Sequence, residues 1–407
     1  MKKCNFCEAT EKKSSPLISA QDGVCICKNC IEAGFEIFNG SKKKTEETPN
    51  TKELKLFNLP ILFPSKITSL LNEHIIGQTQ AKKVLSVAVS NHYKKLRHKP
   101  NSTVELEKSN VLFLGPTGSG KTLLAQRLSK ILDVPLAIAD ATSLTEAGYV
   151  GDDVENILVR LYNAADHDIK KTEHGIIFID EIDKIAKKGA NASITRDVSG
   201  EGVQQALLKI IEGSEVDIPV EGGRKSSQSK RISINTENIL FICGGSFAGI
   251  EEIIQKRAKI KQKSLGFKTI SNEKQKNEDE IDILSLVENE DLIQFGLIPE
   301  LIGRLHTHAT LKKLSIEDLA EIITEPKNSI LKQTIEIFKI SNVKFELTKE
   351  AIQSIAEYSF KKETGARGLR GIFEDLTLDY LYEIEKYENK TIKIDKKEVQ
   401  DIFKIVD

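Results

Sequence analysis

Three short apolar runs in the middle of the chain predict buried strands, at residues 110–114, 175–180 and 239–243. The first run is followed by helical spacing of apolar residues over 123–132. Alternation of strand and helix patterns from about residue 70 to 310 predicts a parallel α/β domain. The rest of the chain has helical apolar spacing and one strand-like stretch at 390–395, which predicts a smaller, α-rich domain.

A polar stretch after residue 38 precedes this pattern. Residues 39–53 carry almost no apolar side chain and mix charges with turn formers, which is typical of a flexible linker. We therefore expect four segments: a cysteine-rich domain over 1–40, a linker over 41–58, a large α/β domain over 59–312 and a small domain over 313–407.

Composition and charge exclude several classes of protein. The 407 residues include 59 Lys+Arg and 60 Asp+Glu, and a net charge of −1 argues against binding nucleic acid by bulk electrostatics. There is no run of about 18 apolar residues and no apolar stretch at the start, so we expect neither a membrane span nor a cleaved signal. The histidines form no metalloprotease pattern, so no peptidase activity is expected.

Five of the six cysteines lie within the first thirty residues. Cys4 with Cys7 and Cys27 with Cys30 form two Cys-x-x-Cys pairs, a spacing that predicts a structural zinc site with four thiolate ligands. Disulfide pairing is the alternative, and it requires an oxidising compartment that nothing else in the chain indicates. Cys25 is a competing ligand, but it lacks the spacing of the first pair, and we leave it unligated.

The strand pattern at 110–114 leads into a loop that matches G-x-x-x-x-G-K-[ST] in full. Glycines in such a loop let backbone amides converge on phosphates at a helix N-terminus. Lys121 is expected to reach the β- and γ-phosphates, and Thr122 to bind Mg²⁺. The expected nucleotide contacts in this loop are Gly115, Pro116, Thr117, Gly118, Ser119, Gly120, Lys121, Thr122 and Leu123.

The strand pattern at 175–180 ends in two carboxylates, Asp180 and Glu181. Asp180 is expected to hold Mg²⁺, and Glu181 to orient and polarise the water that attacks the γ-phosphate. A solvated strand end is the alternative for such a pair, but the phosphate loop upstream favours a single site for ATP hydrolysis.

Further motifs continue along the chain. They are Ile-Ile-Gly-Gln at 75–78, Gly-Tyr-Val-Gly at 148–151, Arg-Asp-Val-Ser-Gly-Glu-Gly-Val-Gln at 196–204, Leu-Ile-Pro-Glu-Leu-Ile-Gly-Arg at 297–304 and Gly-Ala-Arg-Gly-Leu-Arg at 365–370. With these motifs in this order behind a four-cysteine module, the chain resembles the AAA+ ATPases and, within them, the ClpX family of ATP-dependent unfoldases. The resemblance runs nearly end to end. It implies an AAA+ parallel-sheet nucleotide domain, a small α-rich C-terminal domain and an N-terminal zinc module.

The resemblance also implies roles for apolar residues near the nucleotide and in a central pore. Ile75 and Ile76 would contact the adenine, with plain core packing as the alternative. Tyr149 and Val150 would form a pore loop that grips a polypeptide. An aromatic and a branched side chain between glycines can press apolar surface on varied sequences, although such a tetrapeptide alone would be an ordinary turn.

Two further loops are implied for substrate contact. Arg196 and Val198 correspond to a second pore loop, and Arg224 and Lys225 to an entrance loop. The entrance loop departs from the family pattern, because Ser226 stands where a histidine is usual. Recognition at the pore entrance is therefore expected to differ. Solvated basic residues are the alternative for Arg224 and Lys225.

Two arginines match family positions that act on the nucleotide. Arg304 corresponds to an arginine finger that reaches the γ-phosphate of a neighbouring subunit, and Arg367 to a sensor on the small domain. Arg370 is the weaker candidate for the second role. After the strand at 239–243, residues 244–246 offer no polar group that we can assign as a sensor, and Cys243 is expected to be a buried strand residue.

A basic stretch at 256–276 contains Leu265, Gly266 and Phe267. The resemblance implies that these three residues dock on the ClpP peptidase, because the family presents an Ile-Gly-Phe tripeptide there. Two apolar side chains in a polar loop suit a peptide anchor that enters a pocket. A basic surface loop or a weak nucleic-acid patch is the alternative.

The expected function is ATP-dependent unfolding and translocation of proteins through a homohexameric ring that delivers them to ClpP. The expected cofactors are ATP, Mg²⁺ and Zn²⁺. The expected partners are tagged or unfolded proteins and adaptors bound by the zinc domain. Neither membrane binding nor direct binding of nucleic acid is expected. The cytoplasm of a bacterium is the expected location. One rival is an AAA+ remodeller of nucleic acid or protein–DNA complexes without a protease partner. A non-enzymatic scaffold is disfavoured by the full set Lys121, Asp180, Glu181, Arg304 and Arg367.

Overall fold

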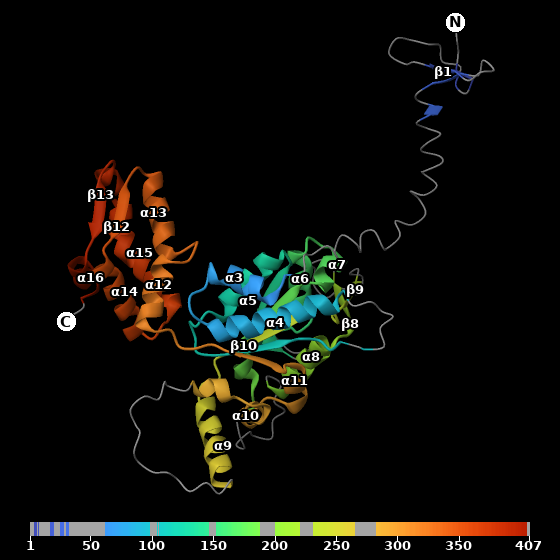
Figure 1. Ribbon diagram of the computed structural model, residues 1–407, viewed down its shortest axis with the longest axis horizontal. Coiled ribbons are helices and arrows are strands. Elements are labelled where there is room, and N and C mark those ends of the chain that lie inside the picture. Colours follow the sequence, from blue (N-terminus) through green and yellow to red (C-terminus); the bar gives the residue numbers. More distant parts are fainter. Residues whose placement is uncertain are drawn as a thin grey trace. The chain divides into compact units, whose positions relative to one another are not determined.

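The structure is a computed structural model (Figure 1) that describes residues 4, 5, 7, 17–19, 25–27, 30–31, 62–97, 104, 106–145, 152–187, 200–219, 231–264 and 282–404. The chain forms two compact units, Met1–Pro60 and Ile61–Asp407. None of the helices in these residues is long and apolar enough to cross a membrane.

In the first unit, a small antiparallel sheet joins β1 (Leu17–Ser19) to β2 (Cys25–Cys27), with Leu17 opposite Cys27. Cys25 and Cys27 are buried, although the segment is short. So few residues supply little core, which makes the chemistry of the cysteines important for holding the unit together.

The second unit is built on a five-stranded parallel sheet in the order β11-β3-β10-β7-β4. The strands are β3 (Val111–Leu114), β4 (Leu136–Asp140), β7 (Ile176–Asp180), β10 (Leu240–Gly245) and β11 (Thr307–Thr310). Strands β3, β7 and β10 lie at the three apolar runs that predict strands. Because the strands are parallel, their carboxyl ends share one edge, and β10 stands between the strands that lead to the phosphate loop and to Asp180.

Helices cover both faces of this sheet (Figure 1), so its strands are apolar on both sides. Phe113 and Phe178 pack in the core beneath α3 (Pro64–Asn72), α4 (Thr79–Lys95) and α5 (Lys121–Leu132). Leu112, Ile177 and Cys243 face the opposite core, formed with α6 (Asn156–Ala164), α8 (Glu201–Glu212), α10 (Asn289–Phe295) and α11 (Pro299–Arg304). Cys243 is fully buried, as predicted.

Short elements complete this part of the second unit. They are η1 (Ala141–Ser143), β5 (Leu144–Thr145), β6 (Asp152–Asp153), α7 (Ile169–Glu173), η2 (Ile182–Ile185), β8 (Glu215–Pro219), β9 (Arg231–Asn235), α9 (Ile250–Ser264) and η3 (Ile283–Leu286). Strands β8 and β9 pair as an antiparallel hairpin, which follows directly from the end of α8.

The C-terminal part is α-rich, as predicted, and has its own core. It contains α12 (Ile316–Thr324), α13 (Ile330–Ile340), β12 (Lys344–Leu347), α14 (Lys349–Lys361), α15 (Ala366–Tyr382), η4 (Ile384–Tyr387), β13 (Thr391–Ile394) and α16 (Lys396–Phe403). Strand β13 lies in the predicted strand-like stretch and pairs in parallel with β12. Phe338 and Phe345 stack in the core with ring centroids 4.7 Å apart. Ser315 and Thr348 cap the helices α12 and α14 through their hydroxyl groups.

Candidate nucleotide and zinc sites

The loop between β3 and α5 has the backbone geometry of a phosphate cradle. Gly118 has a φ of 79°, and a Cβ added there would lie 2.7 Å from the carbonyl oxygen of Thr364, just ahead of α15. Gly120, with a φ of 101°, directly precedes α5. Both positions favour glycine, because other residues rarely adopt positive φ. The loop therefore delivers the chain to the N-terminus of a 12-residue helix, where backbone N–H groups and the helix dipole favour an anion.

Lys121 is the cation of this loop and is 8% exposed. Its ammonium donates hydrogen bonds to the carbonyl oxygens of Gly115 at 2.7 Å and Pro116 at 3.0 Å. Burial lowers the pKa of Lys121, while the carboxylates of Asp180 and Asp183 act in the opposite direction. The side chain is thus held over the loop, where a phosphate would bring further negative charge.

Thr122 and Asp180 meet at the carboxyl edge of the sheet. The Thr122 hydroxyl donates to a carboxylate oxygen of Asp180 at 2.8 Å. The other Asp180 oxygen accepts from the backbone N–H of Glu181 at 3.0 Å. A hydroxyl and a carboxylate oxygen are ligands that Mg²⁺ accepts beside phosphate and water, so this pair fits the predicted magnesium site.

Glu181 adopts a left-handed backbone conformation, with a φ of 56°, and is exposed. This conformation is uncommon for a residue other than glycine and costs of order 1–3 kcal/mol, and such strain is concentrated at functional sites. It turns the chain sharply as β7 ends and lets Glu181 line the pocket together with Asp180.

These residues line a pocket of about 310 Å³. Its walls are formed by Thr117, Gly118, Gly120, Lys121, Thr122, Leu123, Asp180, Glu181, Asp183, Lys184, Ser246, Ala366 and Arg367. The pocket brings together the loop, the end of β7, the end of β10 and the start of α15. Most of the sequence-predicted loop residues are therefore in one place, whereas Gly115, Pro116 and Ser119 do not line its wall.

Three polar residues of the pocket were not predicted: Asp183, Lys184 and Ser246. Ser246, directly after β10, donates to Asp183 from its hydroxyl at 2.9 Å and from its backbone N–H at 3.0 Å. Burial alone would raise the pKa of Asp183, but hydrogen bonds from Lys184 and Ser246 outweigh burial and lower it. Ser246 thus supplies the polar group at the end of β10 that sequence reasoning left unassigned. Its position directly after a buried strand is the signal that could have identified it.

The arginines predicted to act on the nucleotide lie in different places. Arg367, in the first turn of α15, lines the pocket, whereas Arg370 points to α13 and donates to Gln333 at 3.2 Å. Arg304, at the end of α11, does not line this pocket. Its Nε donates to Glu212 at 2.9 Å. The position of Arg304 is compatible with action outside its own subunit.

The isoleucines predicted to contact adenine lie between α3 and α4. Ile75 is 5% exposed and belongs to the core, Ile76 is half-buried, and neither lines the pocket. Gln78, in the same motif, donates to the carbonyl oxygens of Ser119 at 3.3 Å and Lys312 at 2.9 Å. Its side-chain oxygen accepts from the Lys312 backbone at 2.9 Å. The motif therefore ties the phosphate loop to the segment that leads into the small domain.

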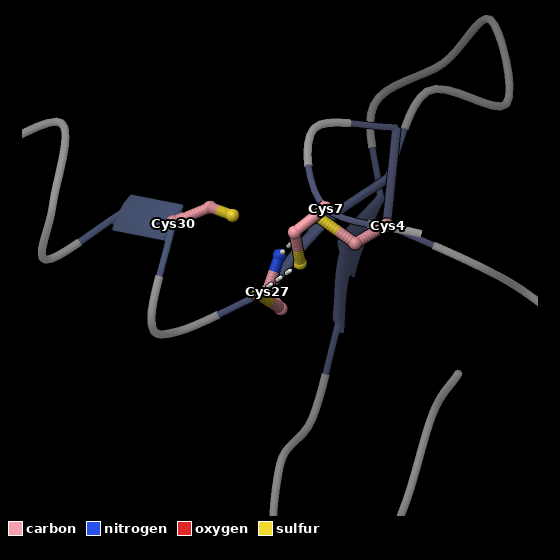
Figure 2. Close-up of side chains that lie close together, drawn as sticks. All are labelled: Cys4, Cys7, Cys27 and Cys30. Atoms are coloured by element: carbon pink, nitrogen blue, oxygen red, sulfur yellow. Dashed lines mark hydrogen bonds between the residues drawn. The ribbon is translucent and has the colours of Figure 1, made fainter. Parts of the chain in front are cut away.

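The four predicted zinc ligands lie together in the first unit. Figure 2 shows Cys30 pointing its sulfur toward Cys4, Cys7 and Cys27. The four sulfur atoms lie within 4.8 Å of one another, and Zn–S bonds of about 2.3 Å in a tetrahedron require about 3.8 Å between sulfurs. Cys25 is not among the clustered residues. The donor set fits a structural zinc ion with no open position.

The cysteines of this cluster also contact one another through hydrogen bonds. The Cys27 backbone N–H donates to the Cys4 sulfur at 3.3 Å, and the sulfurs of Cys7 and Cys27 are 3.5 Å apart. A hydrogen bond with Cys7, followed by burial, raises the pKa of Cys30 to about 12. A divalent cation would favour the thiolate forms that this crowding disfavours, so metal binding and folding are coupled here.

Comparison with known proteins agrees with this geometry. Residues 2–40 match the description "ClpX C4-type zinc finger", residues 106–308 "AAA domain (Cdc48 subfamily)" and residues 314–399 "C-terminal, D2-small domain, of ClpB protein". The chain is also 51% identical over 383 residues to proteins of Borrelia duttonii (strain Ly) and Borrelia recurrentis (strain A1), covering 94% of this chain and 86% of theirs. Both are named "ATP-dependent Clp protease ATP-binding subunit ClpX".

The chain belongs to the ClpX family. It carries an AAA+ ATPase domain, a four-cysteine zinc finger and a small α-rich domain, which confirms the predicted fold class. Several residues that the resemblance to the ClpX family implicates in substrate or partner binding lie outside the described residues: Tyr149, Val150, Arg196, Val198, Arg224, Lys225, Leu265, Gly266 and Phe267.

Proposed function

We propose that this protein is an ATP-dependent unfoldase and translocase that works as a hexameric ring and passes unfolded chains to the ClpP peptidase. The main support is the convergence of Lys121, Thr122, Asp180, Glu181 and Arg367 on one pocket in a member of the ClpX family. Their side chains are the set that binding and hydrolysis of a nucleoside triphosphate require.

Each group in the pocket has a task that its position supports. The Lys121 ammonium binds oxygens of the β- and γ-phosphates, and the backbone N–H groups at the start of α5 bind the rest of the phosphate chain. Thr122 and Asp180 hold Mg²⁺, which neutralises charge on the phosphates when bound. Glu181 accepts a hydrogen bond from the attacking water and orients it toward the γ-phosphate.

Two arginines make hydrolysis depend on domain closure and assembly. Arg367 enters the pocket from the small domain, so movement of that domain changes the contacts of the nucleotide. Arg304 lies 57% exposed at the end of α11 and acts on the nucleotide held by the neighbouring subunit. Each site is then complete only in a ring.

Further roles fall on the pore, entrance and docking loops, which lie outside the described residues, and on the zinc module, which is described in part. Tyr149 and Val150, the second loop at 196–198 and the entrance loop at 224–225 contact the substrate. Residues 265–267 dock on the peptidase. The zinc module over 1–40 receives adaptors, and the linker over 41–58 separates it from the ATPase domains over 59–312 and 313–407.

The proposal is tested by ATP-driven loss of fluorescence from a folded fluorescent protein that carries a degradation tag. The wild type is compared with Glu181→Gln, with and without ClpP. The proposal expects loss that requires Glu181 and becomes irreversible only with ClpP. ATP hydrolysis without any loss, or stimulation of hydrolysis by DNA but not by unfolded protein, would instead support a nucleic-acid remodeller.

A further inference from the structure

The end of α8 and the end of α11 meet through one ion pair. Arg304 is the last residue of α11, and its Nε donates to a carboxylate oxygen of Glu212, the last residue of α8, at 2.9 Å. The two side chains are 57% and 39% exposed, so the pair adds little to stability. We therefore ask how this contact orients the guanidinium group of Arg304.

Glu212 occupies a position that local physics does not favour. The C-terminal end of a helix carries partial negative charge, so a glutamate in the last turn is repelled, whereas an arginine there is attracted. Arg304 thus suits the end of α11, but Glu212 does not suit the end of α8 unless a nearby cation compensates. In the described residues, Arg304 is the ion-pair partner of Glu212.

The backbones on both sides of this pair are fixed by one segment. Lys108 donates to the carbonyl oxygen of Ile211 at 2.9 Å, next to Glu212. Asn110 is 1% exposed and donates to the carbonyl oxygen of Arg304 at 3.2 Å. Both Lys108 and Asn110 lie just ahead of β3, the strand that leads into the phosphate loop. The backbone at each helix end is therefore held by a hydrogen bond that does not involve the ion pair.

The contact uses only the inner nitrogen of the guanidinium. Within the described part of the chain, the two terminal nitrogens of Arg304 have no hydrogen-bond partner. A carboxylate bound to Nε fixes the plane of the guanidinium group and leaves both terminal nitrogens available for another acceptor. An arginine side chain loses rotamer entropy when it is ordered, and this contact removes part of that entropy in advance.

We propose that Glu212 is a positioning residue for hydrolysis between subunits: it holds Arg304 by Nε so that the terminal nitrogens meet the γ-phosphate in the adjoining subunit. This inference rests on the proposed role of Arg304. Glu212 does not line the pocket of its own subunit. Its effect is therefore on the sites of neighbours.

The test is a double-mutant cycle on the assembled full-length protein. The kcat and KM for ATP are measured for the wild type, Glu212→Gln, Arg304→Ala and the double variant, with ring assembly checked by sedimentation. Glu215→Gln is the matched control, an exposed glutamate on β8 that does not contact Arg304. Glu212→Gln keeps the size of the side chain and removes its charge.

We expect Glu212→Gln to lower kcat about three- to tenfold, with KM for ATP almost unchanged, because orientation in the transition state is lost. Glu215→Gln leaves kcat unchanged, and the double variant has the kcat of Arg304→Ala. The inference would be overturned if Glu212→Gln had the kcat of the wild type. It would also be overturned if Glu212→Gln lowered kcat by the same factor in the Arg304→Ala background as in the wild type. Full activity of Arg304→Ala would overturn the proposed role of the arginine itself, which separates the two failures.

Mixed rings give a second readout that a merely structural effect would not produce. Subunits with Glu181→Gln cannot hydrolyse ATP but keep an intact Glu212–Arg304 pair. Mixed with Glu212→Gln subunits, they supply well-oriented arginines to the active sites of those subunits. The mixture should therefore hydrolyse more ATP than the sum of the two proteins measured separately. A mixture whose activity equals that sum would contradict action on the neighbouring site.

Discussion

A buried amide on α8 gives the sharpest stability prediction. Gln204 is fully buried, and its side-chain nitrogen donates to the carbonyl oxygens of Ile185 at 2.8 Å and Gly296 at 3.4 Å. Its side-chain oxygen accepts from the backbone N–H of Ile298 at 2.8 Å. One side chain therefore joins α8 to the segment after Glu181 and to the start of α11.

The magnitude follows from the groups that a substitution would leave unpaired. Gln204→Met keeps the volume but removes the partners of Ile185 and Ile298, the two short contacts. A buried backbone group left without a partner costs about 1–3 kcal/mol, so two such groups should lower the free energy of unfolding by about 2–6 kcal/mol. The larger apolar surface of methionine offsets a small part of this loss.

The neighbouring residue provides the control. Gln205 is exposed on the same helix, so Gln205→Met should change the free energy of unfolding by less than about 0.5 kcal/mol. Both variants are unfolded in urea and followed by far-UV circular dichroism, since the chain has no tryptophan. Free energies of unfolding that agree within about 0.5 kcal/mol would refute the claim that the amide is needed at position 204.

Three further predictions concern zinc, the small-domain arginine and pH. Cys27→Ser should lose bound zinc, whereas Cys25→Ser should retain it, as measured by the metal content of purified protein. Arg367→Ala should lower the kcat of ATP hydrolysis about tenfold or more, whereas Arg370→Ala, which changes a side chain bound to α13, should lower it less than about twofold. Burial lowers the pKa of His92 to about 3, so below about pH 6.5 the unfolded chain binds a proton that the folded chain does not. The free energy of unfolding should therefore fall by about 2 kcal/mol between pH 7 and pH 5 on account of this group, and His92→Gln should reduce that fall in urea unfolding.

The elements that sequence reasoning predicted are those whose signal is local. The strands β3, β7 and β10 are continuous apolar runs that end at glycines or carboxylates, and the phosphate loop has a fixed spacing of glycines and Lys121. The four zinc ligands also carry their spacing in the sequence. In each case the residue types and their spacing along the chain contain the whole pattern, and tertiary contacts need not be known.

The order of strands in the sheet is a different kind of information. Ser246 and Asp183 are 63 positions apart and meet because β10 pairs with β7. Strand and helix patterns do not reveal which parallel strands are neighbours, so Ser246 was left without a role although its strand was predicted. The same holds for Gln78, whose amide spans 234 positions to reach Lys312.

Glu212 shows why a polar residue can carry a function that its local pattern conceals. On α8 alone it is a glutamate at an unfavourable helix end, and on α11 alone Arg304 is a favourable terminal cation. The packing of the two helix ends explains Glu212, because Arg304 of α11 compensates the misplaced charge at the end of α8. A charge that its own helix disfavours, paired with an arginine whose outer nitrogens are available, is the arrangement expected when a side chain must be aimed at a group beyond its own subunit. The unfavourable charge is then a consequence of orienting Arg304.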